Sequence, residues 1–186
     1  MIVCSLTPRT FKLMDIEAIL RSARAGIPIQ ACSLPGAGGT SPVTVDFGGR
    51  YPKNVWTGQG YIVYIPQPSG AIGYGQEYAA RHVNDWGQRT AWEVIEATKA
   101  FLAEHPAADP ERVGVTGGSY GGYATAWLAT RYTERIRAGV MFVGISNNIS
   151  KRGTTDIAYE ELYVHSGKKL EEQWQIALER SPIYWA

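Results

Sequence analysis

The chain has 186 residues, of which 45% are apolar and 19% are charged, with 18 basic and 17 acidic side chains. This composition is typical of one ordinary globular domain with a hydrophobic core. A net charge of +1 without clustered excess charge argues against nucleic acid, an anionic membrane surface or a polyacidic partner.

Cysteine and hydropathy patterns exclude further classes. The two cysteines, Cys4 and Cys32, are too few for a disulfide framework, and their spacing matches no metal motif. No stretch reaches the roughly 18 apolar residues that a transmembrane helix needs. The apolar start, residues 1–6, is too short for the core of a signal peptide.

The first half of the chain predicts three features. Residues 10–25 carry apolar side chains at near-helical spacing and predict an amphipathic helix. Residues 34–42 form a glycine-rich loop. Residues 60–65, GYIVYI, predict a strand that is apolar on both faces, as in a parallel sheet covered by helices.

Residues 91–104 predict the clearest helix, because their apolar side chains form one broad stripe. Thr90 precedes this stripe as a candidate N-cap. Glu93 follows three residues later, so the pair predicts a capping box.

The second half alternates between strand and helix patterns. We expect strands at 112–116 and 138–145, helices at 120–131 and 168–180, and a loop that reaches to about residue 167. Such alternation predicts an α/β fold, with a mostly parallel sheet and helices on both faces. Functional sites in such folds lie at the carboxyl ends of the strands.

One motif carries chemistry. The segment from Gly117 to Gly121 reads G-x-S-x-G between a predicted strand and a predicted helix, as a nucleophile elbow requires. Ser119 would be the nucleophile, and the backbone N–H of Tyr120, at the helix N-terminus, would be the first oxyanion donor. A glycine-rich turn of this kind also binds phosphate, but no lysine follows the glycines and G-x-G-x-x-G does not occur.

A second oxyanion donor is expected upstream. In α/β-hydrolases a glycine-rich loop that precedes the elbow supplies another backbone N–H, and the loop around Gly39 stands in that order. Taken alone, such a loop is more often only a turn.

Several segments together resemble the prolyl oligopeptidase family of serine peptidases, from about Gly38 to Ala186. They are GGTSPVTVDFGGRYP, QPSGAIGYGQEYAARHVNDWG, ERVGVTGGSYGGYAT, GISNNISKRGTTD and the closing RSPIYWA. The resemblance implies an α/β-hydrolase fold and cleavage of peptides or small proteins through an acyl-enzyme on Ser119. It implies no metal and no organic cofactor, because triad chemistry needs neither.

The triad partners are the point where the chain departs from the family. The family's aspartate and histidine follow the serine after further strands, so we expect both to lie beyond residue 186 and the isolated chain to be inactive. Asp156 and His165 keep the order Ser, Asp, His and are the alternative within the chain. We expect His82 and His105, which precede the serine, to be structural.

The resemblance also suggests a boundary. Residues 1–36 are atypical of the family and are interpreted as a segment of other origin, whereas residues 37–186 are a partial catalytic domain. Ala37 stands where family members carry an aromatic residue or histidine. An esterase or lipase on the same fold, or a binding domain without catalysis, remain the alternative functions.

Overall fold

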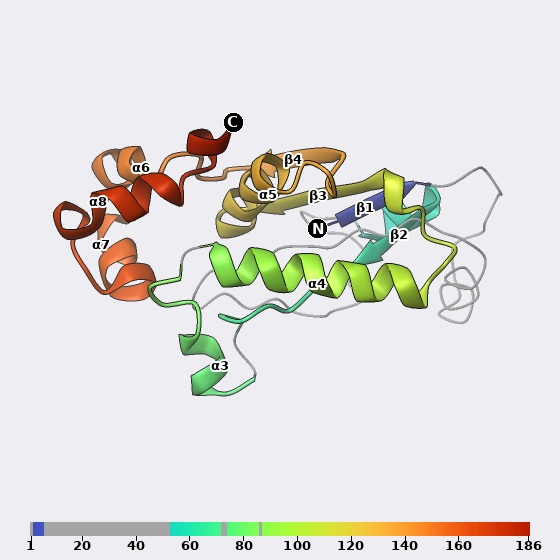
Figure 1. The fold of residues 1–186 in the computed structure, drawn as a ribbon, viewed down its shortest axis with the longest axis horizontal. Coiled ribbons are helices and arrows are strands. Elements are labelled where there is room, and N and C mark those ends of the chain that lie inside the picture. Colours follow the sequence, from blue (N-terminus) through green and yellow to red (C-terminus); the bar gives the residue numbers. More distant parts are fainter. Residues whose placement is uncertain (1, 6–52, 72–73, 86) are drawn as a thin grey trace.

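The computed structural model describes residues 2–5, 53–71, 74–85 and 87–186 (Figure 1). The predicted helix at 10–25 and the glycine-rich loop at 34–42, which includes Gly39, lie outside the described residues. Two predictions therefore have no structural counterpart to compare.

The described strands form one sheet in the order β2-β1-β3-β4. Their bounds are Ile2–Ser5 for β1, Tyr61–Tyr64 for β2, Val113–Gly118 for β3 and Ala138–Phe142 for β4. β3 and β4 are parallel, while β1 pairs antiparallel with both β2 and β3. Because β2, β3 and β4 run in one direction, the prediction of a mostly parallel sheet is confirmed. The reversed β1 was not predicted.

Helices surround this sheet and continue beyond it. They are α2 (Lys53–Gly58), α3 (Gln76–Ala80), α4 (Gln88–Glu104), α5 (Tyr120–Arg131), α6 (Asn148–Thr154), α7 (Ala158–Glu160) and α8 (Leu170–Glu179). A π-helical turn spans Glu161–Ser166, and 3₁₀ turns span Pro110–Arg112 and Pro182–Trp185. Figure 1 shows α6, α7 and α8 gathered beyond one end of the sheet, next to α5.

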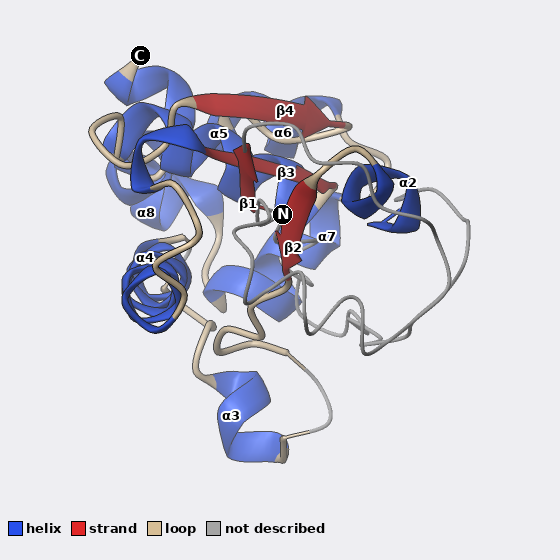
Figure 2. Ribbon diagram, turned by 90° about the vertical axis from the view of Figure 1, so that its right-hand side faces the viewer, coloured by secondary structure: helices blue, strands red, loops and turns tan. Residues whose placement is uncertain are grey.

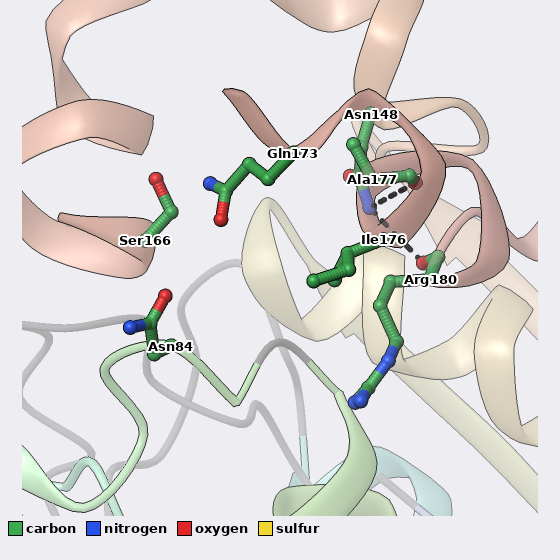
Figure 3. A pocket seen from close by; sticks show the side chains of 7 residues that line it. All are labelled: Asn84, Asn148, Ser166, Gln173, Ile176, Ala177 and Arg180. Atoms are coloured by element: carbon green, nitrogen blue, oxygen red, sulfur yellow. Dashed lines mark hydrogen bonds between the residues drawn. The ribbon is translucent and has the colours of Figure 1, made fainter. Parts of the chain in front are cut away.

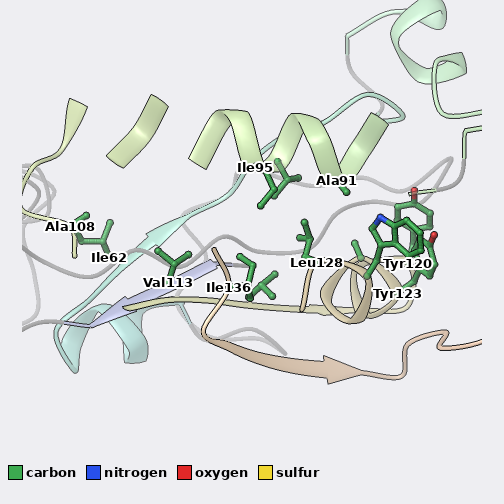
Figure 4. Close-up of a cluster of buried hydrophobic side chains, with 13 residues drawn as sticks. Ile62, Ala91, Ile95, Ala108, Val113, Tyr120, Tyr123, Leu128 and Ile136 are labelled. Carbon is green, nitrogen blue, oxygen red and sulfur yellow. The ribbon is translucent and has the colours of Figure 1, made fainter. Parts of the chain in front are cut away.

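The core lies between α4, α5 and the strands (Figure 4). Apolar side chains of Ala91, Val94 and Ile95 on α4 meet Leu128 on α5, and all four are buried. Burial of each large apolar side chain contributes roughly 1.5–3 kcal/mol, so this stripe is what holds α4 to the rest. The apolar spacing of the predicted helices at 91–104 and 120–131 is confirmed by this packing.

The predicted capping box of α4 is wrong. The helix begins at Gln88, after Gly87 with a left-handed φ of 67°, and Thr90 is buried in its first turn. The Glu93 carboxylate instead accepts from the backbone N–H and the hydroxyl of Ser69, both at 2.6 Å. A Cβ at position 87 would collide with the Tyr123 side chain, so tertiary contact sets this helix start.

β4 differs from its prediction in its environment. Its sequence predicts a strand buried on both faces, yet all five of its residues are exposed, with Val140 at 66%. Within the described part of the chain β4 pairs with β3 on one side only, which leaves it at the sheet edge (Figure 2). An apolar sequence shows that a strand is suited to burial on both faces, but not that a neighbouring strand is present. Among the described residues, β4 has no strand on its second side.

The predicted loop up to residue 167 is largely helical. Asn147 caps α6, because its side chain accepts hydrogen bonds from the backbone N–H groups of Ile149 and Ser150. Such a cap satisfies orphan donors of the first helical turn and fixes the helix start. The final predicted helix is confirmed as α8, within one or two residues.

Candidate active site

Ser119 occupies the sharp turn between β3 and α5. Its backbone lies at φ 56° and ψ −119°, a region that residues with a Cβ rarely adopt. Such a conformation costs about 1–3 kcal/mol and persists only where surrounding contacts impose it. The side chain is exposed, so the strained turn presents the Ser119 hydroxyl to solvent.

Close backbone approaches around the turn require glycine. A Cβ at Gly117 would lie 2.7 Å from the carbonyl carbon of Gly121. A Cβ at Gly122 would lie 2.6 Å from the Cα of Gly144, on the segment that follows β4. Real Cβ atoms do not tolerate such distances, so the glycines of this motif allow strand, helix and the neighbouring loop to converge at the serine.

Tyr120, the next residue, is the first of α5 and its side chain is buried. Its backbone N–H therefore belongs to the end of the helix that carries partial positive charge. The ring stacks on that of His165, with centroids 5.7 Å apart. Burial raises the pKa of the phenol, which is therefore neutral at pH 7.

Ser119 opens into a pocket of about 160 Å³. Its apolar wall consists of Val143, Ile145 and Ile157. Val143 itself has a positive φ of 41°, which is unusual for a β-branched residue and marks a second strained position beside the serine.

Three titratable side chains form another part of the lining, called the titratable wall here. The Lys151 ammonium lies 2.8 Å from one oxygen of Glu160, and His165 Nε2 lies 3.5 Å from the other. Hydrogen bonds from His165 and Lys151 hold the pKa of Glu160 at about 2. Burial lowers the pKa of His165 below 6.5, so the ring is neutral at pH 7. The titratable wall therefore carries one cation and one carboxylate.

The structure brings Ser119 and His165 to one pocket but does not join them. Within the described residues no hydrogen bond links the Ser119 hydroxyl to His165, whose Nε2 faces Glu160. Asp156 is exposed and does not line the pocket. The carboxylate beside His165 is therefore that of Glu160, and not that of Asp156.

The remaining histidines lie elsewhere. His82 is buried, with Nδ1 2.7 Å from the Ala79 carbonyl oxygen, and its ring meets that of His165 edge-on at 5.6 Å. His105 ends α4 and packs on Phe101 with centroids 4.1 Å apart. Both positions agree with structural roles.

Among known protein families, the model of the prolyl oligopeptidase family matches residues 50–182 of the chain. The chain belongs to the prolyl oligopeptidase family. This is a family of serine peptidases, and the fold is that of an α/β-hydrolase.

Individual relatives cover parts of the chain. It is similar to the uncharacterized peptidase YuxL of Bacillus subtilis, with 36% identity over 132 residues, which are 71% of this chain and 20% of YuxL. It is also similar to dipeptidyl-peptidase 5 of Porphyromonas gingivalis, with 32% identity over 107 residues, which are 58% of this chain and 16% of that protein. The chain thus spans about a fifth of the length of these relatives.

A solved structure agrees with the fold. Uncomplexed acylaminoacyl peptidase of Pyrococcus horikoshii superposes with a TM-score of 0.72 and 26% identity, covering 87% of this chain and 26% of that chain. The similarity therefore extends across most of the described residues of this prolyl oligopeptidase family member.

A second, smaller pocket of about 30 Å³ lies apart from Ser119, between the Asn84 loop, the π-helical turn and α8 (Figure 3). Asn148 is 3% exposed and closes one side of it, where its amide nitrogen donates to the Arg180 carbonyl at 3.0 Å. The volume suits a water molecule and no larger ligand. Asn148 begins a glycosylation sequon, but its buried amide is committed to the fold.

Among the described residues no group of three or more His, Cys, Asp or Glu side chains is placed to hold a metal ion. In the same part of the chain, no helix has the length and apolar character needed to cross a bilayer.

The pair formed by Lys151 and Glu160 was not anticipated from the sequence. The two residues lie on α6 and α7, nine positions apart, and no spacing rule connects a lysine and a glutamate across two short helices. Lys151 lies in the family-like stretch GISNNISKRGTTD, but Glu160 lies outside it.

Proposed function

We propose that this chain carries the nucleophile of a serine peptidase and that Ser119 forms the acyl-enzyme. The observation that supports the proposal is an exposed serine held in a strained backbone conformation at the turn from β3 into α5. Strain of this kind is maintained at functional sites, where it fixes a reactive group in place. Family membership supplies the reaction class.

The chemistry follows from the turn. The Ser119 hydroxyl oxygen adds to the carbonyl carbon of the scissile peptide bond, and its proton passes to a base. The oxyanion forms next to the backbone N–H of Tyr120, where the positive end of α5 stabilises it. The Gly39 backbone is the second proposed donor. The base gives this proton to the amine nitrogen, the C–N bond breaks, and water then hydrolyses the ester that remains on Ser119.

The base is proposed to come from outside residues 1–186. Of the histidines in the chain, His165 is the candidate for the base, but its Nε2 faces Glu160 and its ring is buried against Tyr120. A general base must reach the proton that it removes. Loss of a triad member typically lowers turnover by about 10⁴-fold, so we propose that these 186 residues alone are a poor catalyst.

Residues 1–36 are proposed to be of separate origin from the catalytic domain at 37–186. The family match that begins at residue 50 is compatible with this boundary. Sequencing of the source DNA across codons 30–40 tests it: a frameshift there supports the proposal, and a continuous frame contradicts it.

The proposed function is tested by measuring turnover with the full-length product of the gene. Peptide amides and short acyl esters are compared in the wild type, in Ser119→Ala and in Ser150→Ala, a control that removes an exposed serine outside the pocket lining. Amide hydrolysis that only Ser119→Ala abolishes supports a peptidase. Ester hydrolysis without amide hydrolysis indicates an esterase, and unchanged function in Ser119→Ala indicates a binding domain.

A further inference from the structure

The pocket beside Ser119 combines an apolar wall with an ion pair, and this combination bears on substrate choice. Val143, Ile145 and Ile157 contribute apolar side chains to its lining, and Lys151 and Glu160 contribute charged ones. A group that reacts with Ser119 must place a neighbouring side chain in the space next to the hydroxyl. The lining of this pocket is therefore the surface that such a side chain contacts.

Glu160 is the more exposed of the two charges in this lining. Its side chain is 32% exposed, whereas that of Lys151 is 7% exposed. A carboxylate has about four lone-pair sites. Lys151 takes one site of Glu160 at 2.8 Å, and His165 Nε2 takes a second, at 3.5 Å from the other oxygen. Glu160 therefore retains acceptor capacity toward the pocket.

The charge of Glu160 is permanent under working conditions. Its pKa of about 2 keeps the carboxylate ionised at any pH at which peptidases are assayed. Its neighbour His165 is neutral at pH 7, since burial lowers the pKa of that ring. Lys151 offsets part of the negative charge, but its side chain is more buried than that of Glu160.

We propose that this pocket binds a lysine or arginine side chain of the substrate, next to the scissile bond, with Glu160 as its acceptor. The inference rests on the proposed function, because the pocket is defined by its place beside Ser119. The methylene stem of such a side chain packs along Val143, Ile145 and Ile157, while its charged end reaches the carboxylate. Acidic side chains are repelled by Glu160.

The test compares kcat/KM for peptides that differ only in the residue before the scissile bond. Lysine is compared with norleucine, which has the same four-carbon stem without the ammonium group, and with glutamate and alanine. The full-length product of the gene is used. We expect lysine to exceed norleucine by about tenfold, the scale of one hydrogen bond to a charged group that Lys151 partly offsets.

Two variants give opposite expectations. Glu160→Gln keeps the shape but removes the charge, so the lysine to norleucine ratio falls to about one. Lys151→Met leaves the carboxylate without its internal cation, so the ratio rises above that of the wild type. Lys99→Met, which removes the cation of an exposed ion pair on α4, leaves the ratio unchanged. Circular dichroism confirms that each variant is folded.

The outcomes separate the two proposals. A pair with a purely structural role would lower activity toward all peptides and leave the ratio where it was, which would overturn the inference. A wild-type ratio of one, with alanine peptides cleaved in a Ser119-dependent way, overturns the inference and leaves the peptidase proposal intact. Absence of Ser119-dependent cleavage of every peptide overturns both.

Discussion

The backbone N–H of Ser119 donates to the carbonyl oxygen of Phe142, at 3.1 Å, which ties the nucleophile turn to the last residue of β4. A second bond, from the Tyr123 N–H to the Ser119 carbonyl at 3.0 Å, fixes the other side of the turn to α5. Strand, helix and serine therefore form one unit, and the strained Ser119 backbone is imposed by contacts on both sides.

Ser119→Gly should be more stable than Ser119→Ala. At an ordinary position alanine is the more stable of the two by roughly 0.5–1 kcal/mol. At φ 56° and ψ −119° a Cβ is disfavoured, so only glycine relieves the strain. We expect the order to reverse by about 1 kcal/mol in urea denaturation, with both variants catalytically silent. Alanine proving the more stable would show that the turn is unstrained.

Gly122→Ala should destabilise the chain by about 1–3 kcal/mol, the usual cost of inserting a methyl group into a filled space. The new Cβ would lie 2.6 Å from both the Gly144 Cα and the Phe142 carbonyl oxygen. Gly153→Ala on α6 is the matched control, because nothing lies within 4 Å of its Cβ position. We expect this control to be neutral or slightly stabilising in thermal unfolding. Equal effects of both changes would contradict the close approach at Gly122.

Acid should weaken the fold through Glu160. Its folded pKa of about 2 lies below the ordinary 4.5, so its contribution is complete above pH 4.5 and is lost as the pH falls toward 2. Because the side chain is 32% exposed, solvent screening reduces the contribution to about 1–2 kcal/mol. Urea unfolding between pH 2 and 7 measures this loss.

Glu160→Gln provides the comparison for that acid dependence. The difference in unfolding free energy between wild type and variant should shrink as the pH falls from 4.5 toward 2. Glu160 raises the pKa of His165, so the buried ring weakens the variant more than the wild type as the pH falls below about 6.5, and the test therefore uses only the change between pH 4.5 and 2. A difference that stays constant with pH would mean that Glu160 titrates normally.

The exposed apolar surface of β4 should promote self-association. Val140, Met141 and Phe142 of β4 and the following residue, Val143, are all exposed, and apolar edge strands favour intermolecular strand pairing. Val140→Lys places a charge on this edge and should lower light scattering on concentration. Trp92→Lys, which removes an exposed aromatic side chain from α4, should change it much less. The same reduction in both variants would show that β4 has no special part.

The sequence predicted what is local. The elbow and the helix at 120–131 follow from glycine spacing and apolar periodicity over neighbouring residues, and both lie where expected. The predicted start of α4 was wrong because the contact of Gly87 with Tyr123 joins segments that are distant in the chain. The predicted burial of β4 was wrong because apolar composition does not reveal whether a second strand is present beside it.

The charged residues that line the pocket could not be predicted from the sequence for the same reason. Asp156 was considered as the partner of His165 on chain order alone, but the π-helical turn brings Glu160 to that ring instead. Lys151 joins them from α6, a helix within a stretch that was expected to be a loop. Such a cluster arises only from the folding of three short segments against one another.

We propose that Ser119 is the nucleophile and that its base lies outside these 186 residues. The most direct test is fluorophosphonate labelling of the folded chain, read by intact mass and peptide mapping, with and without added imidazole. We predict slow labelling at Ser119 that imidazole accelerates and Ser119→Ala abolishes. Fast labelling that imidazole does not change would show that the chain holds its own base, and labelling that survives in Ser119→Ala would remove Ser119 as the nucleophile.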